Sequence, residues 1–181
     1  MNLFNIVERL SNLQHNGLLK SESLGYLPSV QINALYYLSI CNHYSNTPGA
    51  VTEYLGLTKG TVSQSLQKLE EQGLIVRNND LKDKRKVRLT LTQKARNAID
   101  DSLSNDCISK MQTILPDNGL LLRSQLLELL RSAQRVEGRK FFGECHACRY
   151  HQLRNGTPFC GLTLEPIPVL NISLICREFD E

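Results

Sequence analysis

Four cysteines within the last 37 residues have the spacing of a metal site. They follow the pattern C-x2-C-x11-C-x15-C. A C-x2-C turn places two thiolates on one edge of a tetrahedron, and two more thiolates complete the shell of a zinc ion or an iron–sulfur cluster. In a reducing compartment, clustered cysteines favour metal binding over disulfides. The predicted metal ligands are Cys145, Cys148, Cys160 and Cys176.

The spacing leaves the identity of the metal open. Common structural zinc modules use two C-x2-C pairs, whereas here fifteen residues split the second pair. We therefore expect an iron–sulfur cluster, of the 4Fe–4S or 2Fe–2S type, with zinc as the alternative. A third hypothesis, a thiol-redox enzyme that uses Cys145 and Cys148 as a reactive pair, needs a βαβ pattern that the tail lacks. Cys41 and Cys107 lie on apolar helical stripes and are interpreted as small buried hydrophobic residues.

Ahead of this tail, residues 47–73 predict two short helices joined by a tight turn. Thr47 can cap the first helix, Pro48 suits its first turn, and Gly56 ends it. The second helix begins at Thr58 and continues to Gly73, with an apolar stripe of Val62, Leu66 and Leu69. Two short helices with a glycine-containing turn are typical of a helix-turn-helix.

The hydrophobic period then changes from helical to alternating, which predicts a β-hairpin over residues 74–92. Residues 74–76 and 87–92 are the expected strands, and the tip at 82–86 is entirely charged. A hairpin behind a helix-turn-helix is a wing. On it, Arg85 can reach a minor groove, Asp83 can hold its guanidinium in place, and Lys82, Lys84, Lys86 and Arg88 can contact phosphates.

The second helix carries polar side chains opposite its apolar stripe, as a helix in the major groove requires. Glutamine can pair with adenine through two hydrogen bonds, and serine can bond to several bases. An ordinary solvated helix is the alternative interpretation. The predicted DNA contacts are Lys59, Ser63, Gln64, Gln67 and Lys68 on the helix, and Asp83, Lys84, Arg85 and Lys86 on the wing.

Charge and composition agree with a DNA-binding protein. Of the net charge of +3, residues 45–95 contribute +4, while residues 141–181 contribute −2. The 41% hydrophobic content is ordinary for a globular protein, and no apolar run is long enough to span a membrane. The N-terminus lacks the basic region of a secretory signal. We expect a cytoplasmic protein without a membrane partner.

Four further helices are predicted, over roughly 1–18, 29–45, 93–114 and 118–137. The last two are richer in apolar positions than a small winged-helix core needs. Such surplus apolar faces usually mark a partner surface, so we expect a homodimer.

The runs Thr52–Ser63, Leu69–Arg77 and Asp83–Thr92 resemble the MarR family of bacterial transcription regulators, with Asp83 and Arg85 at the signature positions of the wing. The resemblance covers roughly residues 1–138. It implies a homodimer built from the terminal helices, a palindromic operator in double-stranded DNA, and repression relieved by a signal.

The sequence therefore predicts a mainly α chain with a small β-wing. Residues 1–140 form a winged helix-turn-helix with long dimerisation helices, and residues 141–181 form a four-cysteine module. The expected function is a regulator, not an enzyme, whose DNA affinity depends on an iron–sulfur cluster as a redox signal. The alternative is structural zinc with a small organic inducer. The sequence has no G-x-S-x-G, phosphate-loop or H-E-x-x-H motif.

Overall fold

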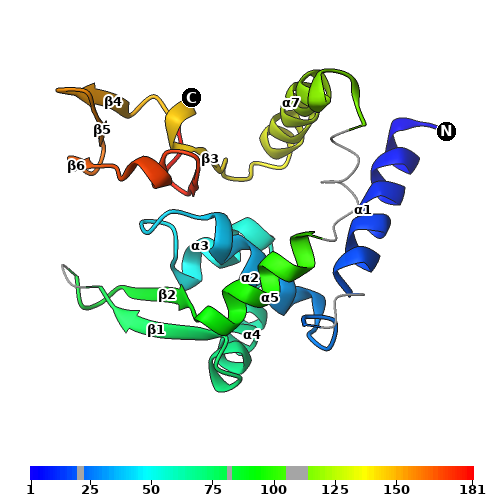
Figure 1. Cartoon of the computed structure of the whole chain (residues 1–181), viewed down its shortest axis with the longest axis horizontal. Helices are drawn as coiled ribbons and strands as arrows, with labels where there is room; N and C mark the ends of the chain where they lie inside the picture. The colour runs from blue at the N-terminus through cyan, green and yellow to red at the C-terminus, as the bar shows by residue number, and fades with distance from the viewer. Residues whose placement is uncertain (20–22, 81–82, 105–113) are drawn as a thin grey trace.

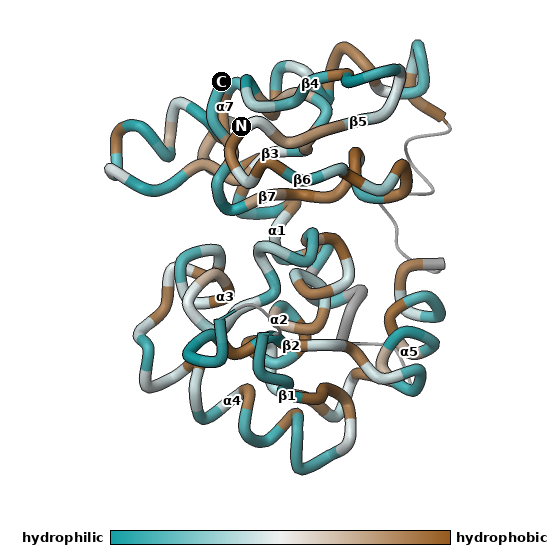
Figure 2. Tube along the Cα trace, turned by 90° about the vertical axis from the view of Figure 1, so that its left-hand side faces the viewer, coloured by the Kyte–Doolittle hydropathy of each residue, from teal (hydrophilic) through white to brown (hydrophobic). Residues whose placement is uncertain are grey.

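The computed structural model describes residues 1–19, 23–80, 83–104 and 114–181 of the chain. Its elements form two layers (Figures 1 and 2), with the helix-turn-helix and wing in one layer and α7 with the C-terminal tail in the other. In chain order, the elements that precede the tail are α1 (Leu3–Leu19), α2 (Ser29–Ile40), α3 (Pro48–Leu55), α4 (Lys59–Glu71), β1 (Ile75–Asn79), β2 (Val87–Leu91), α5 (Gln93–Ser104), η1 (Pro116–Gly119) and α7 (Leu120–Val136).

The helix-turn-helix is defined by the caps that the sequence predicts. The Thr47 hydroxyl accepts a hydrogen bond from the Ala50 N–H at 3.2 Å, and Thr58 does the same for Thr61 at 3.2 Å. Gly56 ends α3 with a φ of +64°, a left-handed conformation that glycine adopts without strain. These caps set both ends of α3 and the start of α4, and α4 ends at Glu71, slightly before the predicted end at Gly73.

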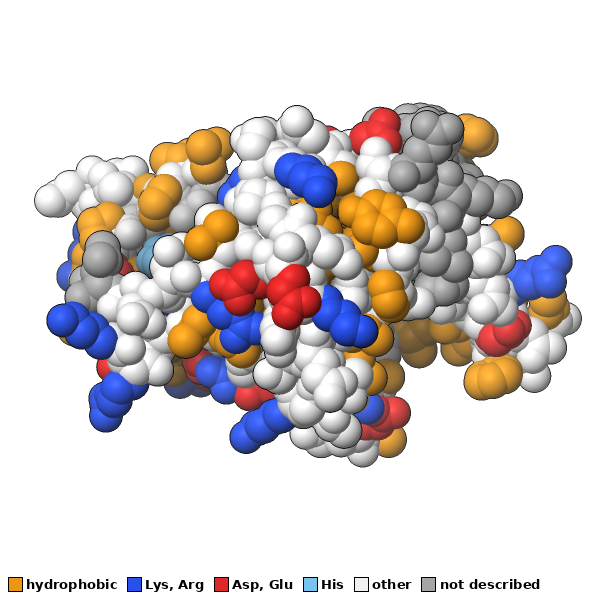
Figure 3. Space-filling view, turned by 90° about the horizontal axis from the view of Figure 1, so that it is seen from below, with side chains coloured by type: hydrophobic (Ala, Val, Ile, Leu, Met, Phe, Trp, Pro, Cys, Tyr) orange, Lys and Arg blue, Asp and Glu red, His pale blue; other side chains and the backbone are white. Residues whose placement is uncertain are grey.

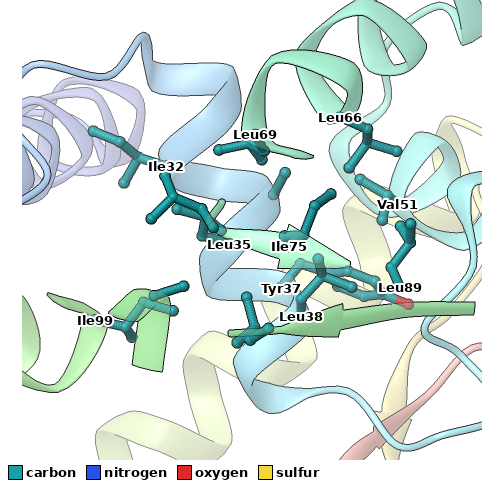
Figure 4. Packing of buried hydrophobic residues seen from close by; sticks show 14 of the residues in the cluster. Ile32, Leu35, Tyr37, Leu38, Val51, Leu66, Leu69, Ile75, Leu89 and Ile99 are labelled. Atoms are coloured by element: carbon teal, nitrogen blue, oxygen red, sulfur yellow. The ribbon is translucent and has the colours of Figure 1, made fainter. Parts of the chain in front are cut away.

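One hydrophobic core holds the winged helix together (Figure 4). Side chains from α2, α3, α4, β1, β2 and α5 meet in it, and its members include Leu35, Tyr37, Val51, Leu66, Leu69, Ile75, Leu89 and Ile99. The predicted stripe of Val62, Leu66 and Leu69 is fully buried, which confirms which face of α4 points inward. Strands β1 and β2 pair antiparallel from Ile75 opposite Leu91 to Asn79 opposite Val87.

The predicted helix 29–45 is too long. Helix α2 ends at Ile40 because Cys41 is extended and the Asn42 N–H donates to the Ile175 carbonyl at 2.9 Å. The first strand also lies later than residues 74–76, at Ile75–Asn79. Helix α5 is described as far as Ser104. Residues 105–113 of the predicted helix 93–114, Cys107 among them, lie outside the described residues, and Ile114 lies in a turn. Helix α7 begins at Leu120 after a 3-10 turn, two residues later than predicted.

The tail folds into short antiparallel pairs rather than helices. Its elements are β3 (Gly143–Glu144), η2 (Cys145–Ala147), β4 (His151–Arg154), β5 (Thr157–Cys160), β6 (Glu165–Pro166), η3 (Val169–Asn171) and β7 (Ile175–Cys176). The register sets Gly143 opposite Cys176 and His151 opposite Cys160. This pairing brings the beginning and the end of the tail together.

Helices α1 and α7 carry apolar side chains that the rest of the chain leaves uncovered. No side chain of α7 is buried. The exposed apolar residues of the two helices include Leu3, Phe4, Ile6, Val7, Leu10, Leu13, Leu120, Leu121, Leu122, Leu126, Leu129 and Leu130.

Candidate DNA-binding surface and four-cysteine pocket

Helix α4 presents the predicted base-reading side chains to solvent. Lys59, Ser63, Gln64, Gln67 and Lys68 are all exposed, opposite the buried stripe. The Gln67 side-chain amide donates to the Glu71 carboxylate at 2.9 Å. Gln67 therefore has a partner within its own helix, and it must exchange that bond to contact a base.

On the wing, Asp83 holds Arg85 in the arrangement that the sequence predicts. The Arg85 Nε lies 3.1 Å from Asp83 Oδ1, and the Arg85 backbone N–H donates to the same oxygen at 3.2 Å. These hydrogen bonds lower the pKa of the Asp83 carboxyl below its usual value. The Arg85 side chain stays 91% exposed, so it projects outward in a fixed direction. Lys84 and Lys86 beside it are exposed as well.

Arg88, by contrast, is not available for phosphate contacts, and that part of the prediction is wrong. Its guanidinium lies 2.6 Å from the Asp80 carboxylate and donates to the carbonyls of His43 and Tyr44 at 2.7 and 3.0 Å. The residue is drawn inward because β2 lies against the loop between α2 and α3, which offers these acceptors. Lys82, another predicted phosphate contact, lies outside the described residues.

The face that carries α4 is moderately basic. In Figure 3, lysine and arginine side chains are spread over the surface seen from below, with a few acidic side chains among them. Contact with a polyanion would thus depend on a small number of well-placed cations rather than on a continuous basic patch.

The four tail cysteines line one cavity of about 30 Å³. The turn at η2 provides Cys145 and Cys148, and the strand ends at β5 and β7 provide Cys160 and Cys176. Residues of the winged helix, Asn42 among them, complete the wall. As they stand, however, no three His, Cys, Asp or Glu side chains of the described residues are arranged to hold a metal ion.

Within this pocket, Cys145 and Cys176 affect each other's pKa. A hydrogen bond between the two thiols raises the pKa of Cys145 and, together with hydrogen bonds from Asn42 and Ser45, lowers that of Cys176 to about 6. Metal binding needs deprotonated sulfur, so an environment that stabilises one thiolate suits a cation.

Asn42 and Ser45 belong to the site, although the sequence analysis did not single them out. The Asn42 side-chain N–H donates to Cys145 Sγ at 3.2 Å, across 103 positions of sequence. The Ser45 hydroxyl accepts from the Arg177 N–H at 2.8 Å. An asparagine and a serine after a helix read as an ordinary turn, so no local signal pointed to them.

Cys41 is buried, as predicted, and is 8% exposed. Burial raises the pKa of its thiol to about 12, so it remains a neutral hydrophobic group at physiological pH. Cys107 lies outside the described residues.

Comparison with known proteins identifies the helix-turn-helix and wing. The model of the MarR family matches residues 25–86. Residues 25–86, which contain the helix-turn-helix and most of the wing, are thus similar to the MarR family. Members of this family are transcriptional regulators, not enzymes, in agreement with the prediction. No curated protein sequence matches the chain.

Solved MarR-type structures share the fold at low sequence identity. The Staphylococcus aureus MepR–DNA complex matches with a TM-score of 0.58 and 20% identity, over 73% of this chain and 98% of that one. CouR of Rhodococcus jostii, bound to p-coumaroyl-CoA, matches with a TM-score of 0.58 and 20% identity, over 71% and 88%. A MarR-like regulator of Thermotoga maritima matches with a TM-score of 0.52 and 23% identity, over 75% and 98%.

Within the described ranges, none of the helices combines the length and the apolar character that crossing a membrane requires.

Proposed function

We propose that this protein is a MarR-type transcription regulator, a repressor, which binds a palindromic operator in double-stranded DNA as a homodimer. The observation that carries the proposal is the combination of an outward-facing polar side of α4 with an Arg85 that Asp83 orients at the wing tip. MepR, which shares the fold, is seen in complex with DNA. A regulator of this kind works where the chromosome is, so we expect a cytoplasmic protein.

The homodimer is supported by the uncovered apolar faces of α1 and α7. The exposed leucines of these faces are 37–64% exposed in the single chain, and leaving so much apolar surface in water costs free energy. A second copy that covers this surface also sets the distance between two recognition helices. Two half-sites about one helical turn apart then determine which DNA the dimer can bind.

We further propose that Cys145, Cys148, Cys160 and Cys176 bind a metal and that its occupancy modulates DNA affinity. The support is that all four cysteines line one cavity, although they are up to 31 positions apart in the sequence. An iron–sulfur cluster would make this site a redox sensor. Zinc is the second candidate, and it is favoured by the cavity volume of about 30 Å³, which suits a single ion better than a cluster.

With structural zinc, the inducer would be a small organic molecule. CouR, a neighbour in fold, is bound to p-coumaroyl-CoA. In this chain a second cavity, of about 200 Å³, lies between α7 and the tail, with Arg123 and Arg131 beside Phe141 and Phe179. This mixture of cationic and aromatic side chains suits an aromatic anion.

DNA binding is tested by selecting duplexes from a random library with the full-length protein and measuring their affinity by fluorescence anisotropy. We expect an enriched inverted repeat, with binding that weakens as salt increases. Arg85→Ala should weaken binding about tenfold, which corresponds to about 1.4 kcal/mol. Arg154→Ala is the matched control, because Arg154 lies on β4, away from α4 (Figure 1). Failure to enrich any duplex would contradict the proposal.

The metal is tested on protein purified without oxygen. Iron, sulfide and zinc contents per chain, together with the visible absorption spectrum, distinguish a cluster from a single zinc ion. Cys160→Ser should reduce metal content, whereas Cys41→Ser should not, because Cys41 is a buried residue of the winged-helix core. Metal-free protein with no affinity for either metal would refute this part.

A further inference from the structure

Asn42 contacts both the four-cysteine pocket and the loop that leads to the wing. It is 2% exposed and follows α2 directly after Cys41. Its Oδ1 accepts three hydrogen bonds, from the Tyr44 N–H at 3.1 Å, the Ser45 N–H at 3.1 Å and the Ser45 hydroxyl at 2.8 Å. These donors fix the orientation of the amide. Its Nδ2 is thereby directed at the Cys145 sulfur, 3.2 Å away.

The same loop is bound to the tail at two more points. The Asn42 backbone N–H donates to the Ile175 carbonyl at 2.9 Å, and the Ser45 hydroxyl accepts from the Arg177 N–H at 2.8 Å. Ile175 and Arg177 flank Cys176 on either side. Residues 42–45 of the winged-helix part therefore hold the sulfur of Cys145 and the backbone on both sides of Cys176.

On its other side, the loop holds the wing. Arg88 of β2 donates to the carbonyls of His43 and Tyr44, and the Leu89 N–H donates to the Asn46 carbonyl at 2.7 Å. The Asn46 side chain returns a bond to the Leu89 carbonyl at 3.0 Å. Thr47, the next residue, caps α3. Residues 42–47 thus contact the cysteine pocket and the wing, and they lead directly into the first helix of the helix-turn-helix.

We infer that Asn42 is a positioning residue that couples the state of the cysteine pocket to the wing. The inference rests on the proposed metal binding. A metal held by the four cysteines would draw the Cys145 sulfur toward it, and the Asn42 amide that is bonded to this sulfur would shift with it. Through the loop at residues 43–46, the positions of Arg88 and β2 would then differ between the metal-bound and the metal-free protein.

A second contact, between Arg177 of the tail and Glu53 of α3, also connects the cysteine pocket to the helix-turn-helix. Arg177, next to Cys176, forms a two-pronged ion pair with Glu53 of α3, and this pairing lowers the pKa of the Glu53 carboxyl. Glu53 belongs to the helix that precedes the recognition helix. A shift at Cys176 would thus reach the helix-turn-helix directly, in parallel with the route through Asn42.

The decisive variant is Asn42→Asp, which retains an Oδ1 acceptor for Tyr44 and Ser45 but replaces the N–H donor with oxygen. Metal affinity is measured by Co²⁺ titration, followed by the sulfur-to-cobalt charge-transfer band, and by Zn²⁺ competition with a chelator. We expect a 10- to 100-fold loss of metal affinity, the range typical of residues that support metal ligands. Asn155→Asp, at the turn of β4 and β5, is the control with the same charge change, and it should behave as wild type.

The second readout is the ratio of DNA affinities of the Zn²⁺-loaded and chelator-treated full-length protein. We expect this ratio to differ from one in the wild type and in Asn155→Asp, and to approach one in Asn42→Asp at saturating metal. Ser45→Ala, which removes the acceptor of Arg177 and leaves a small side chain in a buried site, should reduce the ratio in the same direction. This second variant keeps the test decisive if Asn42→Asp does not fold.

The possible failures can be distinguished. If the wild type binds neither Co²⁺ nor Zn²⁺, the proposed metal site is wrong and the coupling falls with it. If the wild type binds metal and its DNA affinity responds, but Asn42→Asp and Ser45→Ala retain the wild-type ratio, the metal site stands and the role of Asn42 is overturned.

Discussion

The Arg88 guanidinium and the Asp80 carboxylate form a 2.6 Å ion pair at the base of the wing, with both side chains less than 20% exposed. The Asp80 carboxylate also accepts the Asp83 N–H at 3.0 Å. One acidic residue therefore anchors β2 and, at the same time, shapes the turn that presents Arg85.

Arg88→Ala is expected to destabilise the fold rather than to remove a DNA contact. The substitution removes the ion pair with Asp80 and the two hydrogen bonds to the carbonyls of His43 and Tyr44, so the free energy of unfolding should fall by about 2–3 kcal/mol. Urea denaturation measures this change. Arg85→Ala is the control, since its exposed side chain should leave the unfolding free energy within about 0.5 kcal/mol of wild type. Equal stability of Arg88→Ala and wild type would contradict the structural role of Arg88.

Asp83→Asn tests whether DNA affinity depends on the orientation of the Arg85 guanidinium or only on its positive charge. The substitution makes the wing more positive, so simple electrostatics predicts tighter binding to DNA. We expect instead a loss of about three- to tenfold, because the oriented guanidinium of Arg85 loses its charge-assisted partner. Anisotropy titrations on the selected operator, at two salt concentrations, measure the effect. Tighter binding would show that charge alone matters.

Gln64→Ala should relax base preference, whereas Lys59→Ala should weaken binding to all sequences alike. Gln64 is exposed on the outer side of α4, where an amide can form two bonds with adenine, each such pair being worth about 1–3 kcal/mol of discrimination. The measurement is the affinity for operators with single base-pair changes. A Gln64→Ala variant that discriminates among them as sharply as wild type would place base reading elsewhere.

Leu126→Asp should dissociate the homodimer. Leu126 lies on the apolar face of α7 and is 45% exposed in the single chain. A carboxylate buried between two copies has no partner, so the dimer dissociation constant should rise by roughly 100-fold or more. Sedimentation measures the mass, and operator affinity should fall in parallel. Arg154→Asp, on β4, makes a larger charge change outside α7 and should remain dimeric.

The winged helix was largely predictable because its signals are local. Thr47, Gly56 and Thr58 mark helix ends by short-range hydrogen bonds and backbone conformation, and the stripe of Val62, Leu66 and Leu69 fixes the buried face of α4. The Asp83–Arg85 bond spans two residues and follows from the same short range.

The predictions from sequence failed where a residue is positioned by contacts with segments far away in the sequence. Helix α2 ends early because the Asn42 N–H donates to the carbonyl of Ile175, a residue of the distant tail, instead of continuing the helix. Arg88 turns inward because its guanidinium donates hydrogen bonds to the carbonyls of His43 and Tyr44, which lie more than forty positions earlier in the sequence. The role of Asn42 at Cys145 spans 103 positions. Periodicity and capping rules carry no information on such contacts, which depend on the completed fold.

The shared loop at residues 42–47 also bears on how the chain can be dissected. Cutting the polypeptide after residue 140 would strip the amide of Asn42, the hydroxyl of Ser45 and the carboxylate of Glu53 of the groups that satisfy them. Such a fragment would expose these polar groups of the loop and of α3 to water and would lose the contacts that hold them in place. A truncated protein is therefore a poor substitute for the full-length chain, and the two should give different affinities in the same binding assay.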